Sequence, residues 1–163
     1  MSELSGLSDA AVVLTQVAVP EALAAACALQ KLPVDAIGTP IGALAWCHDT
    51  SDGGPASVAR AVSGLLPNVP VLLLEQRGGQ ISASRWSGGT AGAAMSPGLV
   101  LDGAPAVVEQ LLLGRATPAD QPGAVTSAGM SRWRATRTLT AISRATRRAA
   151  RAAGAGTDVE PSD

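Results

Sequence analysis

The sequence of 163 residues contains no phenylalanine and no tyrosine, and its large aromatic side chains are limited to Trp46, Trp86 and Trp133. Proteins that bind unpaired nucleotides stack successive bases on aromatic side chains, at about 1–3 kcal/mol per base. Three dispersed rings supply little of this stacking. The composition therefore argues against a sheet that serves as an RNA-binding platform.

Long hydrophobic runs are absent as well. No stretch approaches the roughly 20 apolar residues that span a bilayer, and the first residues, Met-Ser-Glu, lack the basic start and apolar continuation of a secretory signal. We expect a cytoplasmic protein. In that compartment Cys27 and Cys47 are expected to be reduced and partly buried, while the sequence leaves a disulfide between them open.

Large aliphatic residues are concentrated in the first part of the chain, where residues 1–115 hold 32 of the 36 leucines, valines and isoleucines. A domain of this length buries roughly 60–70% of its unfolded surface and can fold without a metal or a disulfide. We therefore predict one α/β domain over residues 1–115. A flexible linker is predicted over 116–129, an arginine-rich helix over 130–153 and a disordered acidic tail over 154–163.

Hydrophobic periodicity divides the predicted domain into strands and helices. Apolar or alternating runs predict strands over residues 10–19, 41–47, 69–74 and 81–86. Apolar stripes that begin at or near a proline predict helices over residues 20–32, 55–66 and 105–113. Gly78 and Gly79 suit the mirror-type turn of a hairpin, and residues 87–98 are predicted as a loop, with a short strand possible over 99–101.

The resulting order of elements, β-α-β-α-β-β-α, determines the predicted fold class. Strands that alternate with helices imply right-handed crossovers and parallel neighbours, and the hairpin adds an antiparallel strand. We predict an α/β fold with a small mixed sheet and a separate, basic and amphipathic C-terminal helix.

Charge is divided unevenly along the chain. Residues 1–131 carry a net charge of −5, residues 132–151 a net charge of +7 and the tail a net charge of −3. At 100° per residue, one face of the predicted helix gathers Trp133, Arg137, Arg144, Arg147, Arg148 and Arg151. The opposite face gathers Ala135, Leu139, Ile142, Ala149 and Ala153. The arginine face with Trp133 is the predicted partner-binding surface.

Guanidinium groups suit the bidentate capture of carboxylates or phosphates. The leading interpretation is an acidic protein partner, which includes self-association with a second copy of the chain. Nucleic-acid phosphates and a weak contact with an anionic membrane are alternatives, since the apolar face is too small to insert deeply into lipid. A further alternative is a solvated helix whose arginines reflect only the codon usage of a GC-rich genome.

A second candidate site is the polar loop over residues 47–54, at the end of a predicted strand and before a helix. It contains Cys47 as a candidate nucleophile, His48 as a candidate general base, and Asp49 and Asp52, which together with His48 could ligate a divalent cation. Adjacent residues on a strand point to opposite faces, however, so Cys47 and His48 do not form a nucleophile–base pair there. The simpler interpretation is a turn whose polar side chains bind local backbone N–H groups.

The sequence thus favours a non-catalytic accessory or regulatory module whose helix docks on an acidic partner. A small enzyme or ligand-binding domain that uses the loop, and a nucleic-acid accessory protein that uses the helix, are the alternatives. The acidic residues and histidine of the loop match no specific metal signature, and the sequence predicts neither a metal site nor a cofactor.

Overall fold

The centre of the fold is β1 (Ala10–Leu14), a strand whose five side chains are all buried. The computed structural model describes residues 8–157 of the chain. Alternate side chains of a strand point to opposite faces, so Ala11 and Val13 enter one core while Ala10, Val12 and Leu14 enter another. The sheet is therefore covered on both faces at this strand.

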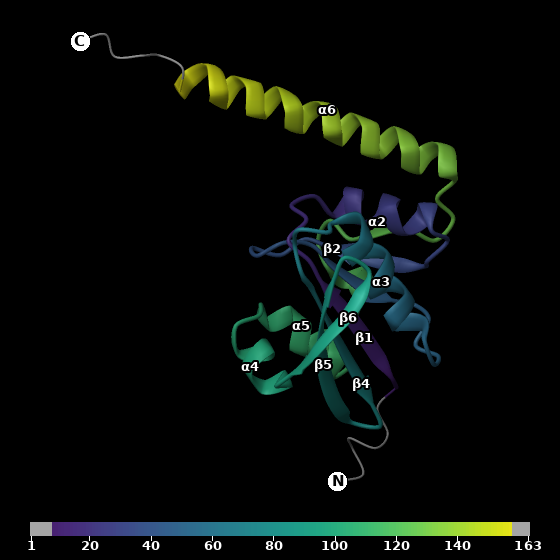
Figure 1. Cartoon of the computed structure of the whole chain (residues 1–163). Coiled ribbons are helices and arrows are strands. Elements are labelled where there is room, and N and C mark those ends of the chain that lie inside the picture. The colour runs from purple at the N-terminus through teal and green to yellow at the C-terminus, as the bar shows by residue number, and fades with distance from the viewer. Residues whose placement is uncertain (1–7, 158–163) are drawn as a thin grey trace, which may run out of the picture.

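β1 lies in the middle of a seven-stranded sheet with the order β6-β5-β4-β1-β3-β2-β7 (Figure 1). The other strands are β2 (Val34–Ile37), β3 (Leu44–Cys47), β4 (Val71–Arg77), β5 (Gln80–Ser87), β6 (Thr90–Met95) and β7 (Val125–Thr126). All six pairings between these strands are antiparallel. With its helices, the chain has a mixed α/β fold built on an antiparallel sheet.

The prediction of a partly parallel sheet is wrong, and the cause is one strand that was not predicted. β2 begins directly after Pro33 and pairs antiparallel with β3, the next strand along the chain. This extra strand reverses the direction of β3, which is therefore antiparallel to β1. The helical connections from β1 to β2 and from β3 to β4 still join strands that run in the same direction. In the sheet, however, β3 lies between β1 and β2, and β1 lies between β3 and β4, so these parallel strands are not neighbours.

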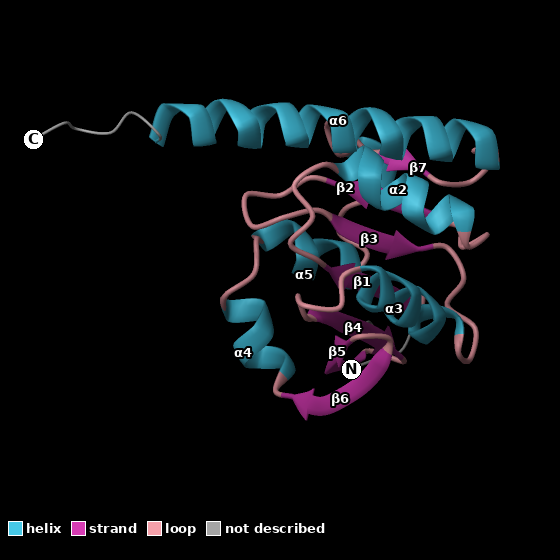
Figure 2. Cartoon of the chain, turned by 45° about the horizontal axis from the view of Figure 1, so that its top comes forward, coloured by secondary structure: helices cyan, strands magenta, loops and turns pink. Residues whose placement is uncertain are grey.

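Helices cover both faces of the sheet. α2 (Pro20–Leu29) and α3 (Gly54–Leu65) pack on the face of Ala11 and Val13, whereas α4 (Pro97–Asp102) and α5 (Ala106–Leu112) pack on the opposite face. Figure 2 shows α6 (Arg132–Thr157) lying outside α2 as a further layer. The three helices predicted in the domain are confirmed as α2, α3 and α5, each with slightly different ends.

The predicted hairpin between β4 and β5 is confirmed. Gly78 and Gly79 have φ angles of 58° and 84°, a conformation open to glycine because it has no Cβ. A second Gly-Gly turn, at residues 88–89, leads into β6 where a loop was predicted. All six side chains of β6 are exposed, so neither face of the strand has to be apolar. Its sequence therefore lacks the alternation of apolar and polar residues that predicts a strand. The prediction of a short strand over residues 99–101 is wrong, because these residues belong to α4.

Residues 116–129, predicted as a flexible linker, contain the 3-10 helix η1 (Pro118–Asp120) and β7. β7 pairs with β2. The Ser127 side chain, directly after β7, donates a hydrogen bond to the Leu32 carbonyl (2.7 Å) and accepts one from the Val34 N–H (2.8 Å). These bonds attach the segment to the sheet just before α6 begins.

Candidate functional site

α6 is fixed to the body near its N-terminal end. Ser131 precedes the helix, and its Oγ accepts a hydrogen bond from the Arg134 N–H (3.1 Å), as an N-cap residue does. Ala135 then lies fully buried against Ala25 and Ala28 of α2. Because alanine adds only a methyl group beyond the backbone, the two helices approach each other closely at this point.

Beyond this contact the helix leaves the body. Leu139 and Ile142 are half-buried, and every side chain from residue 143 to residue 153 is exposed. Figure 1 shows α6 crossing α2 and continuing past it. The helix extends to Thr157, further than the predicted end at residue 153, and residues 158–163 of the predicted acidic tail lie outside the described residues. The second half of α6 is therefore not stabilised by packing against the body.

The charge of α6 is uncompensated within the helix, which contains seven arginines and no acidic residue. The ion pairs among the described residues all lie in the body, so no arginine of α6 takes part in one. Arg144, Arg147, Arg148 and Arg151 are three or four positions apart, and each like-charged pair at this spacing destabilises a helix by roughly 0.2–0.5 kcal/mol. An anionic partner would relieve this repulsion.

Trp133 and Arg137 form a pair on the arginine face. Trp133 is 69% exposed, and the Arg137 guanidinium lies 4.6 Å from the centroid of its ring. At an exposed site such a cation–π contact contributes about 0.5–1 kcal/mol. Tryptophan and arginine are also the residue types most enriched where protein interfaces concentrate their binding energy. The pair is therefore a suitable anchor for a protein partner.

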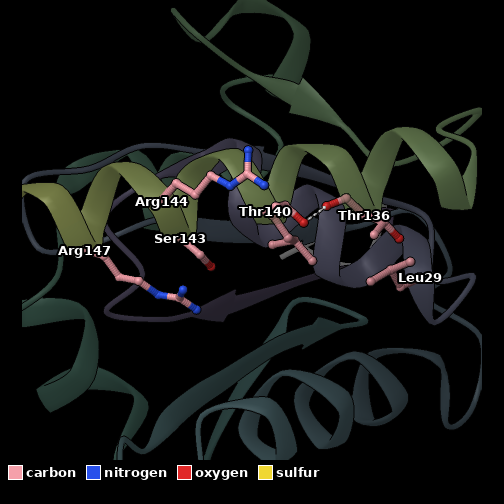
Figure 3. Close-up of a pocket in the computed structure, with 7 residues that line it drawn as sticks. Leu29, Thr136, Thr140, Ser143, Arg144 and Arg147 are labelled. Carbon is pink, nitrogen blue, oxygen red and sulfur yellow. Dashed lines mark hydrogen bonds between the residues drawn. The ribbon is translucent and has the colours of Figure 1, made fainter.

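A groove of about 360 Å³ follows α6 at the point where it leaves α2. Its lining combines hydroxyl groups, guanidinium groups and leucines, contributed by Leu29, Thr136, Leu139, Thr140, Ser143, Arg144 and Arg147. Figure 3 shows these side chains along α6, with Leu29 contributed by α2. The Thr140 hydroxyl donates to the Thr136 carbonyl (2.9 Å). Hydroxyl and guanidinium donors beside an apolar floor suit a carboxylate on a side chain that is partly apolar.

In the loop over residues 47–54, Cys47 points into the core. Its residue is fully buried, and this burial, more than the nearby charges of Cys27, Glu75 and Asp49, raises the pKa of its thiol from 9.0 to about 12. The thiolate is the nucleophilic form of cysteine. At neutral pH the Cys47 thiol is therefore protonated and out of contact with solvent.

His48 lies on the other side of the sheet from Cys47. Its Nε2 is 2.9 Å from Asp35 Oδ1, and its ring meets that of Trp46 in an edge contact with 5.6 Å between centroids. Asp35 is opposite Trp46 in the register of β2 and β3, which brings the three side chains together. No role is predicted for Asp35 from the sequence, because β2 itself is not predicted and the contact depends on the pairing of β2 with β3.

The two aspartates of the loop belong to a local turn. Asp49 accepts hydrogen bonds from both the N–H (3.0 Å) and the hydroxyl of Ser51, and these bonds lower the pKa of its carboxyl. This is the local turn that the simpler interpretation of the loop described. Asp52 is exposed in the same turn. The structure thus gathers the arginine face of α6 on one surface, whereas no hydrogen bond among the described residues joins Cys47, His48 and Asp49 to one another.

Comparisons with protein-family models, with curated proteins and with solved structures found no significant match. In the part of the chain that the structure describes, no three His, Cys, Asp or Glu side chains are grouped as metal ligands. None of the described helices combines the length and the apolar character that crossing a membrane requires. Among the surfaces that the described residues form, α6 carries the strongest charge, with seven arginines and no acidic residue.

Proposed function

We propose that this chain is a non-catalytic, cytoplasmic accessory or regulatory module whose helix α6 docks on an acidic protein partner. The observation that supports this proposal is the projecting half of α6, which is exposed on all sides, carries four arginines over residues 143–153 and forms no ion pair with any described residue. The binding surface consists of Trp133, Arg137, Arg144, Arg147, Arg148 and Arg151.

A protein fits this surface better than the other two anionic partners. A nucleic-acid duplex is a long polyanion, and the net charge of −5 on residues 1–131 would repel it wherever it runs alongside the body. A membrane would need an apolar face to insert, yet the apolar residues Leu139 and Ile142 are half-buried and the rest of that face consists of alanine and threonine. A local acidic patch on a protein can match α6 without covering the body.

The test uses poly-L-glutamate as the acidic probe and the full chain as the binding protein, with calorimetry at physiological ionic strength. We expect the triple substitution Arg144→Ala, Arg147→Ala, Arg148→Ala to weaken binding at least about tenfold, which corresponds to ~1.4 kcal/mol. The matched control removes the same number of arginines outside the proposed face, at Arg115, Arg132 and Arg134. It should weaken binding much less, and equal losses in the two triple variants would contradict the proposal.

A charge reversal separates binding from helix stability. Arg144→Glu places a carboxylate four residues before Arg148, an arrangement that stabilises a helix. We expect the helical signal in circular dichroism to be kept or raised while binding of poly-L-glutamate falls. Parallel titrations with a short DNA duplex and with anionic lipid vesicles test the alternatives. Tighter binding of either probe than of poly-L-glutamate, with the same dependence on Arg144, Arg147 and Arg148, would overturn the choice of a protein partner.

A further inference from the structure

β6 forms one edge of the sheet and carries no charged residue and no proline, although its pairing with β5 shifts register between Ser84 and Trp86. Natural edge strands carry charged residues or prolines, or are kept very short, because free backbone N–H and C=O groups pair readily with another strand. β6 has the sequence Thr-Ala-Gly-Ala-Ala-Met, and all six side chains are exposed. It lies within residues 86–101, the longest stretch of the sequence without a charged residue.

An apolar surface adjoins the C-terminal end of this strand. Leu99 is 76% exposed, Ile41 53% and Met95 36%, and all three line a groove of about 530 Å³ together with Leu72 and Ala94. Large apolar side chains that gather beside a free edge are a typical mark of an interaction surface. The edge strand and this groove together define the β6 surface.

We propose that the β6 surface pairs with the β6 surface of a second copy of this chain, strand against strand and antiparallel. An antiparallel pairing of β6 with itself uses the same uncharged patch on both subunits, as the interface of a closed dimer does. Of the two edges of the described sheet, β7 has only two residues and β6 has six. Two antiparallel copies of β6 complement each other, whereas β6 against β7 would leave most of the longer edge unpaired.

Charge also favours this pairing over one through the C-terminal helices. The β6 surface brings no charged residue of its own strand to the contact, whereas two α6 helices would bring fourteen arginines together. Figure 2 shows α6 and β6 at opposite margins of the molecule. A dimer through β6 therefore keeps the two arginine faces apart and leaves both of them free. The inference does not depend on the function proposed for α6.

Sedimentation equilibrium of the full chain over a range of concentrations tests the proposal. We expect the average mass to rise from that of one chain to that of two, with little change between low and high salt because no ion pair is involved. Ala93→Lys adds a charge to the edge and should raise the dissociation constant at least about tenfold. Ala119→Lys, at an exposed residue of η1, is the matched control and should leave the dissociation constant unchanged.

Cross-linking gives a second measurement that does not depend on destabilising a strand. Strands related by a two-fold axis place one residue opposite its own copy. With Ala91, Ala93 or Ala94 at that position, its cysteine variant should form a disulfide-linked dimer rapidly under mild oxidation. Ala119→Cys should not, and the native thiols Cys27 and Cys47 are buried. A chain that stays monomeric at every concentration would overturn the proposal. So would a dimer that dissociates in high salt or on substitution of α6 arginines but is unaffected by Ala93→Lys.

Discussion

The attachment of the segment before α6 can be tested at one hydroxyl group. Ser127 is 4% exposed, and its Oγ both accepts from the Val34 N–H at 2.8 Å and donates to the Leu32 carbonyl at 2.7 Å. The change Ser127→Ala removes both bonds and leaves the Val34 N–H, on a fully buried residue, without its partner.

The expected loss of stability follows from these two bonds. A buried donor left unsatisfied costs about 1–3 kcal/mol, and a typical hydrogen bond contributes ~1 kcal/mol net. We therefore expect Ser127→Ala to lower the free energy of unfolding by about 2–3 kcal/mol. For a chain of this size such a loss lowers Tm by roughly 4–12 °C. Because the loss is concentrated where β7 joins β2, amide protons of the segment before α6 should also exchange faster.

The assay is urea unfolding followed by tryptophan fluorescence, with hydrogen exchange as a local measurement. Thr126→Ala is the matched control, because the Thr126 hydroxyl is in an exposed residue and makes only longer bonds, at 3.2 and 3.5 Å. It should cost less than about 0.5 kcal/mol, as surface substitutions usually do. If Ser127→Ala were no more destabilising than Thr126→Ala, the reasoning that these bonds hold the segment on the sheet would be refuted.

Two further predictions concern backbone conformation and pH. Gly42 has a φ of 131°, and a Cβ added there would lie 2.7 Å from the Gln16 Cα, so Gly42→Ala should cost more than ~3 kcal/mol in urea unfolding. Gly53→Ala, at a φ of 83° with open space around it, should cost only about 1 kcal/mol, and similar losses would contradict this. Burial raises the pKa values of the Cys27 and Cys47 thiols to about 12. Between pH 9 and pH 12 these thiols ionise in the unfolded chain but not in the folded one, which favours unfolding. The free energy of unfolding should therefore be unaffected by the two thiols below pH 9 and should fall as the pH rises toward 12. Substitution of either cysteine by alanine should reduce that decline, and thiol labelling of the native chain should be slow.

Much of the candidate surface could be predicted from the sequence, because a helix converts spacing along the chain directly into position around an axis. Seven arginines without an acidic neighbour define a basic helix wherever it packs. The exposure of Trp133 and its contact with Arg137 follow from a spacing of four residues. The groove beside Leu29 could not be predicted in this way, because it exists only where α2 ends beneath α6.

The pair formed by His48 and Asp35 illustrates the opposite case. Thirteen positions separate the two residues, and they meet only because β2 and β3 lie side by side. β2 is four residues long and follows a proline-terminated helix, so its apolar pattern is too short to distinguish it from a loop. One missed strand changed the direction of β3 and with it the class of the sheet.

The sequence by itself determined the local features of this protein: the helices that begin at prolines, the Gly-Gly hairpin, and the separation of a negatively charged body from a positively charged helix. These depend on residues within a few positions of one another, where backbone geometry leaves few choices. The tertiary structure alone decided which strands are neighbours, that the segment before α6 joins the sheet, and that β6 is left as an open edge. Strand pairing is a contact between distant parts of the chain, and many pairings satisfy the same apolar pattern until the packing of both cores selects one.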